Sequence, residues 1–220
     1  DIKTITALGS YAMTAVTAVT AQDTKGVKKI TPISTKNVQK QITMVLDDIG
    51  SDAVKIGMLH NSSIVKCVYS ILKKYKLKNI VLDPVMVAKG GAKLINNSSI
   101  VYLKKLLLPL SNIITPNIPE AEILTGYSIS NKEDMIKAAK KILNMGSKNV
   151  LLKGGHLKNK MIFDILASKK GIRIFSKKNI KTKNTHGTGC TLSSALATCL
   201  SQKKNVLKSC KISLKYVDRA

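Results

Sequence analysis

The run Asn184-Thr-His-Gly-Thr-Gly-Cys190, followed at once by Thr191-Leu-Ser-Ser-Ala-Leu-Ala-Thr-Cys-Leu200, is the most informative stretch of this chain. Two glycines, two positions apart, stand immediately before a predicted helix of mostly small residues. Such a turn exposes backbone N–H groups at the positive end of a helix dipole, where an anion, most often a phosphate, binds. Cys190 falls in the first turn of this helix, where a thiolate is favoured. A glycine turn that only caps a buried helix is the alternative reading.

Strand-like and helix-like segments alternate along the rest of the chain. Short β-branched runs lie at 15–21, 53–56, 79–82, 112–115 and 149–152, and stretches of helical period lie at 35–49, 62–75, 98–108 and 131–145. This alternation predicts an α/β fold, a three-layer α/β/α sandwich with a mostly parallel central sheet. We also expect a helix over residues 1–8, a capping box at Ser130–Glu133 with a stop at Gly146, and a small edge hairpin formed by residues 172–175 and 179–183.

The length and composition favour one domain over residues 1–220. The chain has 220 residues and no linker, and it begins with Asp1 inside a helical pattern, so we expect a segment trimmed at both ends. No apolar run approaches the ~20 residues of a membrane span, and no signal peptide is recognisable. The four cysteines form no C-x-x-C pair, which favours the cytoplasm and small-hydrophobe packing for Cys67, Cys199 and Cys210.

The net charge of +25 raises the question of a nucleic-acid partner. The lysines are scattered over the whole chain and form no stripe, and only 4% of the residues are aromatic, with no Trp to stack on bases. Arginine, the usual reader of bases, occurs only at Arg173 and Arg219. We therefore expect neither a nucleic-acid partner nor a membrane partner.

A short segment that contains polar residues or glycine follows nearly every predicted strand. In order along the chain they are Gln22-Asp23, Gly57-Met58, Asp83-Pro-Val-Met86, Pro116-Asn117 with Glu120, and Lys153-Gly-Gly-His156. The functional residues of parallel sheets lie just past the carboxyl ends of the strands. We therefore expect these segments to form one site.

Two carboxylates beside an anion-binding helix suit metal-assisted phosphoryl transfer. Asp83 and Glu120 could hold a hydrated divalent cation together with phosphate oxygens. A turn role for Asp83 and a capping role for Glu120 are the alternatives, and Lys153 is either a phosphate ligand or one more surface lysine. We interpret His60, His156 and His186 as polar loop residues. Neither a P-loop nor a Rossmann glycine pattern is present.

Several segments of this sequence resemble those of the hydroxymethylpyrimidine/phosphomethylpyrimidine kinases, which belong to the ribokinase-like superfamily. The resemblance covers essentially the whole chain and rests on residues 17–24, 52–59, 82–89, 114–122, 152–156 and 184–194, in that order. It implies transfer of the γ-phosphoryl group of ATP to 4-amino-5-hydroxymethyl-2-methylpyrimidine, and then to the resulting monophosphate, in thiamine biosynthesis. It also implies that the family's glycine-rich opening segment lies upstream of Asp1.

The resemblance further implies a role for each candidate residue. Gln22 would bind the aminopyrimidine edge, and Met58 and Val85 would pack against the ring. Asp83 and Glu120 would organise Mg²⁺ and the phosphates, with Asn117 and Lys153 on the ATP side. The anion hole would be formed by Gly187, Thr188, Gly189 and Cys190.

Cys190 stands where many relatives of this fold have an aspartate base, and its role as a base or as a part of the anion hole is open. Cysteine at this place is typical of the pyrimidine kinases and of some pyridoxal kinases. A pyridoxal/pyridoxine kinase of the same fold, a catalytically inactive small-molecule-binding domain and a basic nucleic-acid binder are the alternatives. We expect a cytoplasmic homodimer that binds ATP and a small pyrimidine.

Overall fold

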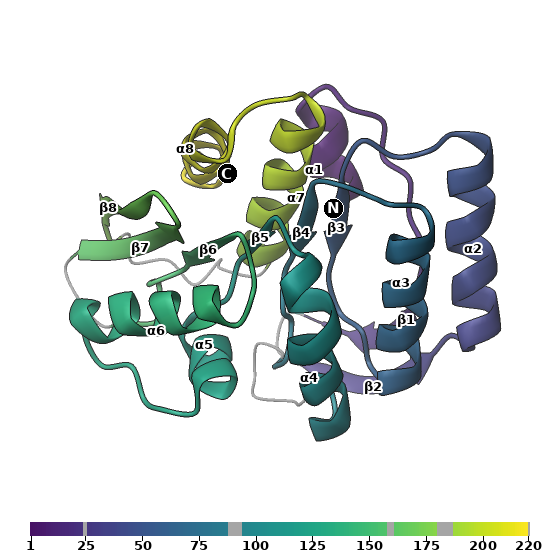
Figure 1. Ribbon diagram of the computed structural model, residues 1–220, viewed down its shortest axis with the longest axis horizontal. Helices are drawn as coiled ribbons and strands as arrows, with labels where there is room; N and C mark the ends of the chain where they lie inside the picture. The colour runs from purple at the N-terminus through teal and green to yellow at the C-terminus, as the bar shows by residue number, and fades with distance from the viewer. Residues whose placement is uncertain (24–25, 88–93, 158–160, 180–186, 220) are drawn as a thin grey trace.

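A mostly parallel sheet forms the centre of the computed structural model, which describes residues 1–23, 26–87, 94–157, 161–179 and 187–219 (Figure 1). Within these residues the strand order is β3-β4-β5-β6-β7-β8. The strands are β3 (Val54–Ile56), β4 (Ile80–Leu82), β5 (Ile113–Ile114), β6 (Asn149–Leu152), β7 (Met161–Ser168) and β8 (Gly171–Lys178). Strands β3 to β6 pair in parallel, and β7 and β8 add an antiparallel edge.

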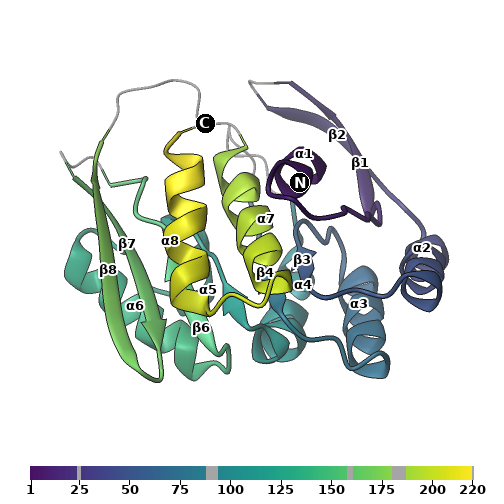
Figure 2. The same cartoon turned by 90° about the horizontal axis from the view of Figure 1, so that it is seen from above.

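Helices cover both faces of this sheet, so the predicted three-layer α/β/α sandwich is confirmed (Figure 2). One face packs on α3 (Ser62–Lys74), α4 (Asn97–Tyr102), α5 (Ile118–Thr125) and α6 (Lys132–Asn144), and α2 (Thr35–Asp48) lies outside α3. The other face packs on α7 (Thr188–Ser201) and α8 (Val206–Val217), and the short α1 (Ile2–Ala7) lies against α7. In the described residues, no helix combines the length and the apolar character that crossing a membrane requires.

Successive side chains of a strand point to opposite faces of the sheet, so they pack against different helix layers. Val81 and Leu151 belong to the core under α7 and α8, whereas Leu82 and Leu152 belong to the core under α3 to α6. Strands β4 and β5 and most of β6 are buried on both faces, because helices cover both sides of the parallel part of the sheet. This explains why these three strands are continuous apolar runs in the sequence.

Local capping explains where the helices begin, with one correction to the expected capping box. The cap of α6 is Asn131, whose side chain accepts from the backbone N–H of Asp134 at 2.8 Å, one residue later than expected. Asp134 in turn accepts from the Ser130 hydroxyl at 2.9 Å. The predicted stop is correct: Gly146 follows α6 with a φ of +116°, a conformation that favours glycine.

The first predicted strand does not join the central sheet, which corrects the sequence-based expectation. β1 (Ala18–Gln22) pairs antiparallel with β2 (Val27–Pro32) in a separate two-stranded sheet. The Gln41 side chain accepts from the Val16 N–H at 2.9 Å and donates to its carbonyl at 3.1 Å, which ties this segment to α2. The residues of β1 are half-buried or exposed, so this strand lacks the two buried faces of the central strands.

The expected edge hairpin is also wrong in its pairing. β8 pairs with β7 from Ser168↔Gly171 to Met161↔Lys178, and a tight turn at Gly171, with a φ of +111°, starts its second strand. The sequence pattern does not mark β7 as a strand, because the polar Asp164 interrupts its apolar run. Residues 180–183, assigned to the expected partner strand, lie outside the described residues.

Candidate active site

One cleft of about 2140 Å³ is lined by all eleven residues to which the sequence analysis assigned a role in the site. These residues are Gln22, Met58, Asp83, Val85, Asn117, Glu120, Lys153, Gly187, Thr188, Gly189 and Cys190. They come from β1 and from the segments after β3, β4, β5 and β6, together with the start of α7. The parallel order of β3 to β6 accounts for this convergence, since the carboxyl ends of these strands lie at the same edge.

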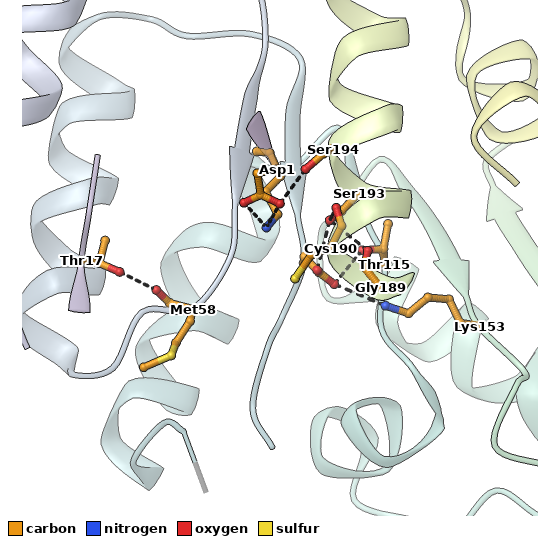
Figure 3. A network of polar contacts seen from close by, with 11 residues as sticks. Asp1, Thr17, Met58, Thr115, Lys153, Gly189, Cys190, Ser193 and Ser194 are labelled. Carbon is orange, nitrogen blue, oxygen red and sulfur yellow. Dashed lines mark hydrogen bonds and ion pairs between the residues drawn. The ribbon is translucent and has the colours of Figure 1, made fainter. Parts of the chain in front are cut away.

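Asp83 is the buried anion at the centre of the cleft, with only 2% of its surface exposed. It follows β4, and its Oδ1 accepts from the Thr115 hydroxyl at 3.1 Å while its Oδ2 accepts from the Ser193 hydroxyl at 3.0 Å (Figure 3). Burial raises the pKa of Asp83, but Lys153, Lys55 and the Ser193 hydrogen bond outweigh it, so its pKa lies below the ordinary value. Asp83 is therefore a fixed negative charge at neutral pH.

Lys153 is a partly buried cation of the cleft and not one more surface lysine. Its side chain is 16% exposed, and its Nζ lies 3.3 Å from Asp83 Oδ1. The backbone N–H of Lys153 donates to the Pro116 carbonyl at 2.9 Å, which fixes the stem of the side chain. Burial lowers the pKa of Lys153, but the negative charges of Asp83 and Glu120 raise it by a larger amount. The pKa of Lys153 therefore lies above its ordinary value. The ammonium therefore stays charged in the cleft.

Glu120 both caps α5 and carries a shifted carboxyl group. Asn117 and Glu120 form a capping box, in which each side chain accepts from the other residue's backbone N–H at 2.9 Å. Glu120 is 4% exposed, and burial raises its pKa to about 7 against the pull of Lys153. Glu120 therefore caps α5. Its carboxyl group also titrates near neutral pH and interacts with the charge of Asp83, which a capping role does not explain.

The start of α7 lies directly against the Lys153 ammonium. Gly187 is the N-cap residue with a φ of +81°, and its carbonyl accepts from the Thr191 N–H at 2.9 Å. A Cβ on Gly189 would lie 3.3 Å from Lys153 Nζ, so glycine here lets the cation approach the helix. In Figure 3 Gly189 and Cys190 lie between Lys153 and Asp1. Residues 184–186 of the glycine run, including His186, lie outside the described residues.

The pyrimidine-side candidates lie where the two-stranded sheet meets the central one. Gln22 ends β1, and Met58 follows β3. The Thr17 hydroxyl donates to the Met58 carbonyl at 2.8 Å, which joins the two sheets at this point. Of the histidines, His156 lines the cleft with a pKa lowered by burial and by Lys153, and His60 Nδ1 bonds to the Leu94 carbonyl at 2.8 Å.

A magnesium ion fits this donor set only together with phosphate oxygens. Throughout the described ranges, no group of three or more His, Cys, Asp and Glu side chains could hold a metal. Asp83 and Glu120 provide two buried carboxylates, and Mg²⁺ in nucleotide sites is bound by one or two carboxylates plus phosphates. The chemistry of the pair therefore suits a cation that arrives with a nucleotide.

Asp164 lines the cleft and was not recognisable from the sequence, whereas Gly154 belongs to the glycine pair that the sequence placed at this site. Asp164 is 6% exposed on β7, and its Oδ1 accepts from the Gly154 N–H at 2.9 Å. This bond fixes the turn directly after Lys153. A Cβ on Gly154 would lie 2.0 Å from the Phe163 carbonyl oxygen, so the turn packs tightly on β7. The glycine pair after β6 was the available signal for the turn, whereas nothing local marked Asp164.

We expect Gly154→Ala to destabilise the protein, because the new methyl group meets a backbone oxygen that cannot move alone. Overpacking of this kind costs roughly 1–3 kcal/mol, which lowers the Tm by about 2–4 °C per kcal/mol in a chain of this size. Gly155→Ala is the matched control, because a Cβ there has nothing within 4 Å. Thermal unfolding of both variants checks the prediction, and equal Tm values would contradict the tight turn.

Comparison with known proteins identifies close relatives. The sequence profile of the family described as phosphomethylpyrimidine kinase matches residues 1–220. The chain is similar to the thiamine biosynthesis bifunctional protein ThiED of Geobacter sulfurreducens, with 44% identity over all of this chain and 45% of the relative. It is 40% identical to the hydroxymethylpyrimidine/phosphomethylpyrimidine kinase of Bacillus subtilis, over 100% of this chain and 82% of that protein.

Solved structures with a similar fold are also kinases. The crystal structure of phosphomethylpyrimidine kinase from Clostridium difficile matches with a TM-score of 0.87 and 41% identity, over 99% of this chain and 89% of that one. Pyridoxal kinase from Staphylococcus aureus, solved with AMP-PCP and pyridoxal, matches with a TM-score of 0.90 and 29% identity, over 98% and 78% of the two chains. The fold is thus shared by two classes of vitamin kinase.

Proposed function

This chain belongs to the phosphomethylpyrimidine kinase family, and we propose which of its residues perform each part of the phosphoryl transfer. It is an ATP-dependent kinase that phosphorylates hydroxymethylpyrimidine and then its monophosphate, giving the pyrophosphate used in thiamine biosynthesis. One observation supports the assignment of the reacting centre more than any other. The Asp83–Lys153 ion pair lies under the glycine-led start of α7, in the cleft that Gln22 and Met58 also line.

We propose that the phosphates of ATP lie between Lys153 and the first turn of α7. The ammonium of Lys153 and the N–H groups of Gly187, Thr188 and Gly189 then bind the γ-phosphoryl oxygens, with Asn117 beside them. Charge neutralisation is the main task of a site of this kind, because the transition state is loose and spreads its charge over these oxygens. The donors are already fixed by the fold, so they need little reorganisation during transfer.

Asp83 and Glu120 are the residues that would hold Mg²⁺. When bound, the ion neutralises the charge that develops on the phosphate oxygens. Asp83 accepts three hydrogen bonds or ion-pair contacts, from Thr115, Ser193 and Lys153, which orient its carboxylate for this role. Glu120 must lose its proton for the role, and its pKa of about 7 makes that possible at physiological pH.

On the other side of the cleft, we propose that the pyrimidine binds to Gln22, Met58 and Val85. An amide side chain offers both a donor and an acceptor to the aminopyrimidine edge, and the apolar side chains suit the ring faces. The hydroxymethyl oxygen then points to the start of α7, where Cys190 lies. We propose that the Cys190 thiolate takes the proton of the attacking hydroxyl group.

Cys190→Ser tests this role, because serine keeps the shape of the anion hole but is a much weaker base. We expect kcat for hydroxymethylpyrimidine to fall roughly 100-fold, the range of a lost general base. Turnover of the monophosphate at pH 8 should change by less than about threefold, because a phosphate dianion has no proton to lose there. Small losses on both substrates would show that the thiol only shapes the hole.

The substrate assignment is tested by ATP consumption with hydroxymethylpyrimidine, its monophosphate and pyridoxal. The pyridoxal kinases that share this fold make pyridoxal the alternative substrate. We expect turnover of both pyrimidines and a much lower kcat/KM for pyridoxal. A clear preference for pyridoxal would overturn the assignment, and absence of any turnover by the full-length protein would favour a binding domain.

We further propose that residues 1–220 form a single kinase domain that works in the cytoplasm as a homodimer, without nucleic-acid or membrane partners. The support for one domain is the continuous central sheet, whose faces both pack against described helices. Light scattering measures the oligomeric state directly. A steep salt dependence of DNA or RNA binding would contradict the absence of a nucleic-acid partner.

A further inference from the structure

A second lysine, Lys55, faces the cleft from the pyrimidine side. It lies in the middle of β3, lines the same cleft as Met58 and Cys190, and its side chain is only 8% exposed. Its ammonium contacts both carboxylate oxygens of Asp1, at 2.9 and 3.1 Å. Lys55 also lowers the pKa of Asp83, so its charge is felt at the reacting centre. The proposed transfer machinery makes no use of it.

The backbone beside Lys55 leaves room for its ammonium next to the predicted pyrimidine pocket. A Cβ on Gly57 would lie 2.9 Å from Lys55 Nζ, so any other residue here would make the flexible end of the Lys55 side chain shift. The next residue is Met58, one of the two predicted ring contacts. Lys55 therefore places a positive charge directly beside the part of the cleft that receives the organic substrate.

The two substrates of the pathway differ sharply in charge. Hydroxymethylpyrimidine brings no phosphate, whereas its monophosphate brings close to two negative charges at neutral pH. Lys153 is already committed to Asp83 and, in the proposed mechanism, to ATP. Of the other lysines among the described residues that line the cleft, Lys177 is bonded to Asp218, and both it and Lys178 lie on the distant β8. Lys55 is the lysine placed beside the pyrimidine.

Asp1 can release Lys55 without being left unsatisfied. Its Oδ1 also accepts from the Ser194 hydroxyl at 2.7 Å, and its side chain is 40% exposed to water. Figure 3 shows Asp1 and Lys153 on opposite sides of the first turns of α7. The neighbouring hydroxyls of Ser193 and Ser194 bond to Asp83 and Asp1 respectively, so α7 lies between two Asp–Lys pairs. The flexible lysine stem lets the second pair open.

We propose that Lys55 is the specificity-determining cation for the second phosphorylation, moving from Asp1 to the phosphate of the monophosphate substrate. This inference rests on the proposed function. In that step an oxygen of the monoester dianion forms a bond to the γ-phosphorus of ATP. The bond from that phosphorus to the β–γ bridging oxygen breaks, and its electron pair leaves with ADP. No proton leaves the nucleophile, so the main obstacle is repulsion between two anions, which Lys55 reduces.

Lys55→Met is the test, because it removes the charge and keeps most of the apolar stem. We expect kcat/KM for the monophosphate to fall roughly 30- to 100-fold, while kcat/KM for hydroxymethylpyrimidine changes less than about threefold. Lys55→Arg should recover part of the loss. Lys178→Met removes one charge from the far side of the same cleft and is the matched control, with both substrates unaffected.

One further measurement distinguishes the possible outcomes. Calorimetric titration of the full-length protein with each pyrimidine, without ATP, measures binding independently of turnover. Wild type should bind the monophosphate more tightly than the parent compound, and Lys55→Met should lose that preference. Equal losses on both substrates, or an unchanged preference, would assign Lys55 a purely structural role. Wild type that binds and turns over neither pyrimidine would instead refute the proposed function, and the inference with it.

Discussion

Replacing Asp83 with asparagine is expected to lower kcat by roughly 100- to 1000-fold while KM for hydroxymethylpyrimidine changes less than about threefold. Asparagine has the same shape and still offers an oxygen to Thr115 or Ser193, but it carries no charge. Lys153 then loses the anion that lies 3.3 Å from its ammonium, and Mg²⁺ loses one of its two proposed carboxylates. Both changes act on the transferring phosphoryl group and not on the pyrimidine.

Thr115→Val is the control for this variant. It removes one hydrogen bond to Asp83, of 3.1 Å, and leaves the charge in place. Steady-state kinetics with each substrate varied separately measures the two effects. A parallel loss of turnover and of pyrimidine affinity in Asp83→Asn would show that Asp83 organises the pocket as a whole and would reject its assignment to the metal.

Glu120→Gln is expected to lower kcat/KM for ATP roughly 100-fold at pH 8, because the second proposed Mg²⁺ carboxylate is lost. Glutamine keeps an oxygen that can accept from the Asn117 N–H, so the helix cap survives. The Mg²⁺ concentration needed for half-maximal rate should rise in the variant. In the wild-type enzyme the same requirement should rise as the pH falls below about 7, since the protonated Glu120 is a poor metal ligand.

The same group makes the stability of the ligand-free protein depend on pH. Because the folded-state pKa of Glu120 is raised from 4.5 to about 7, its contribution to stability is greatest below pH 4.5 and is lost as the pH rises through 7. A shift of this size corresponds to roughly 3 kcal/mol at pH 8. Glu120→Gln should therefore be more stable than wild type at pH 8 and no more stable at pH 4.5, as measured by urea unfolding.

Glu122→Gln provides the matched control on the same helix. Glu122 accepts from the Ile129 N–H at 2.7 Å and lies outside the cleft. Its substitution should leave both the Mg²⁺ requirement and the pH dependence of activity unchanged. If Glu120→Gln and Glu122→Gln gave the same kinetics, Glu120 would be only a capping residue.

The sequence alone predicted the layers of the fold and the edge at which the site lies. Strand and helix periods are encoded over a few residues, and the carboxyl ends of β3 to β6 share one edge as soon as the strands are parallel. Asp83 and Lys153 were recognisable because each directly follows an apolar run, and Asn117 because it follows the Thr-Pro pair that ends the next one. The glycine turn before Cys190 was recognisable because only the local backbone decides it.

Contacts between distant segments were decided only by the tertiary structure. Thr115, Ser193 and Ser194 are ordinary polar residues in the sequence, yet Ser193 meets Asp83 across 110 positions of chain. β1 left the central sheet because its partner is the neighbouring β2, a choice that its own apolar run could not reveal. In each case the partner depends on strand pairing and helix packing, which no local pattern encodes.

The ionisable groups of the site were likewise determined partly by the sequence and partly by the tertiary structure. The sequence left Lys153 as either a phosphate ligand or a surface lysine, and Glu120 as either a metal ligand or a cap. Burial beneath α7 made Lys153 part of the cleft and raised the pKa of Glu120 to about 7. Residue type and spacing determine which groups can ionise. Only the packed fold determines how far each lies from water and from an opposite charge, and these distances decide what each group does.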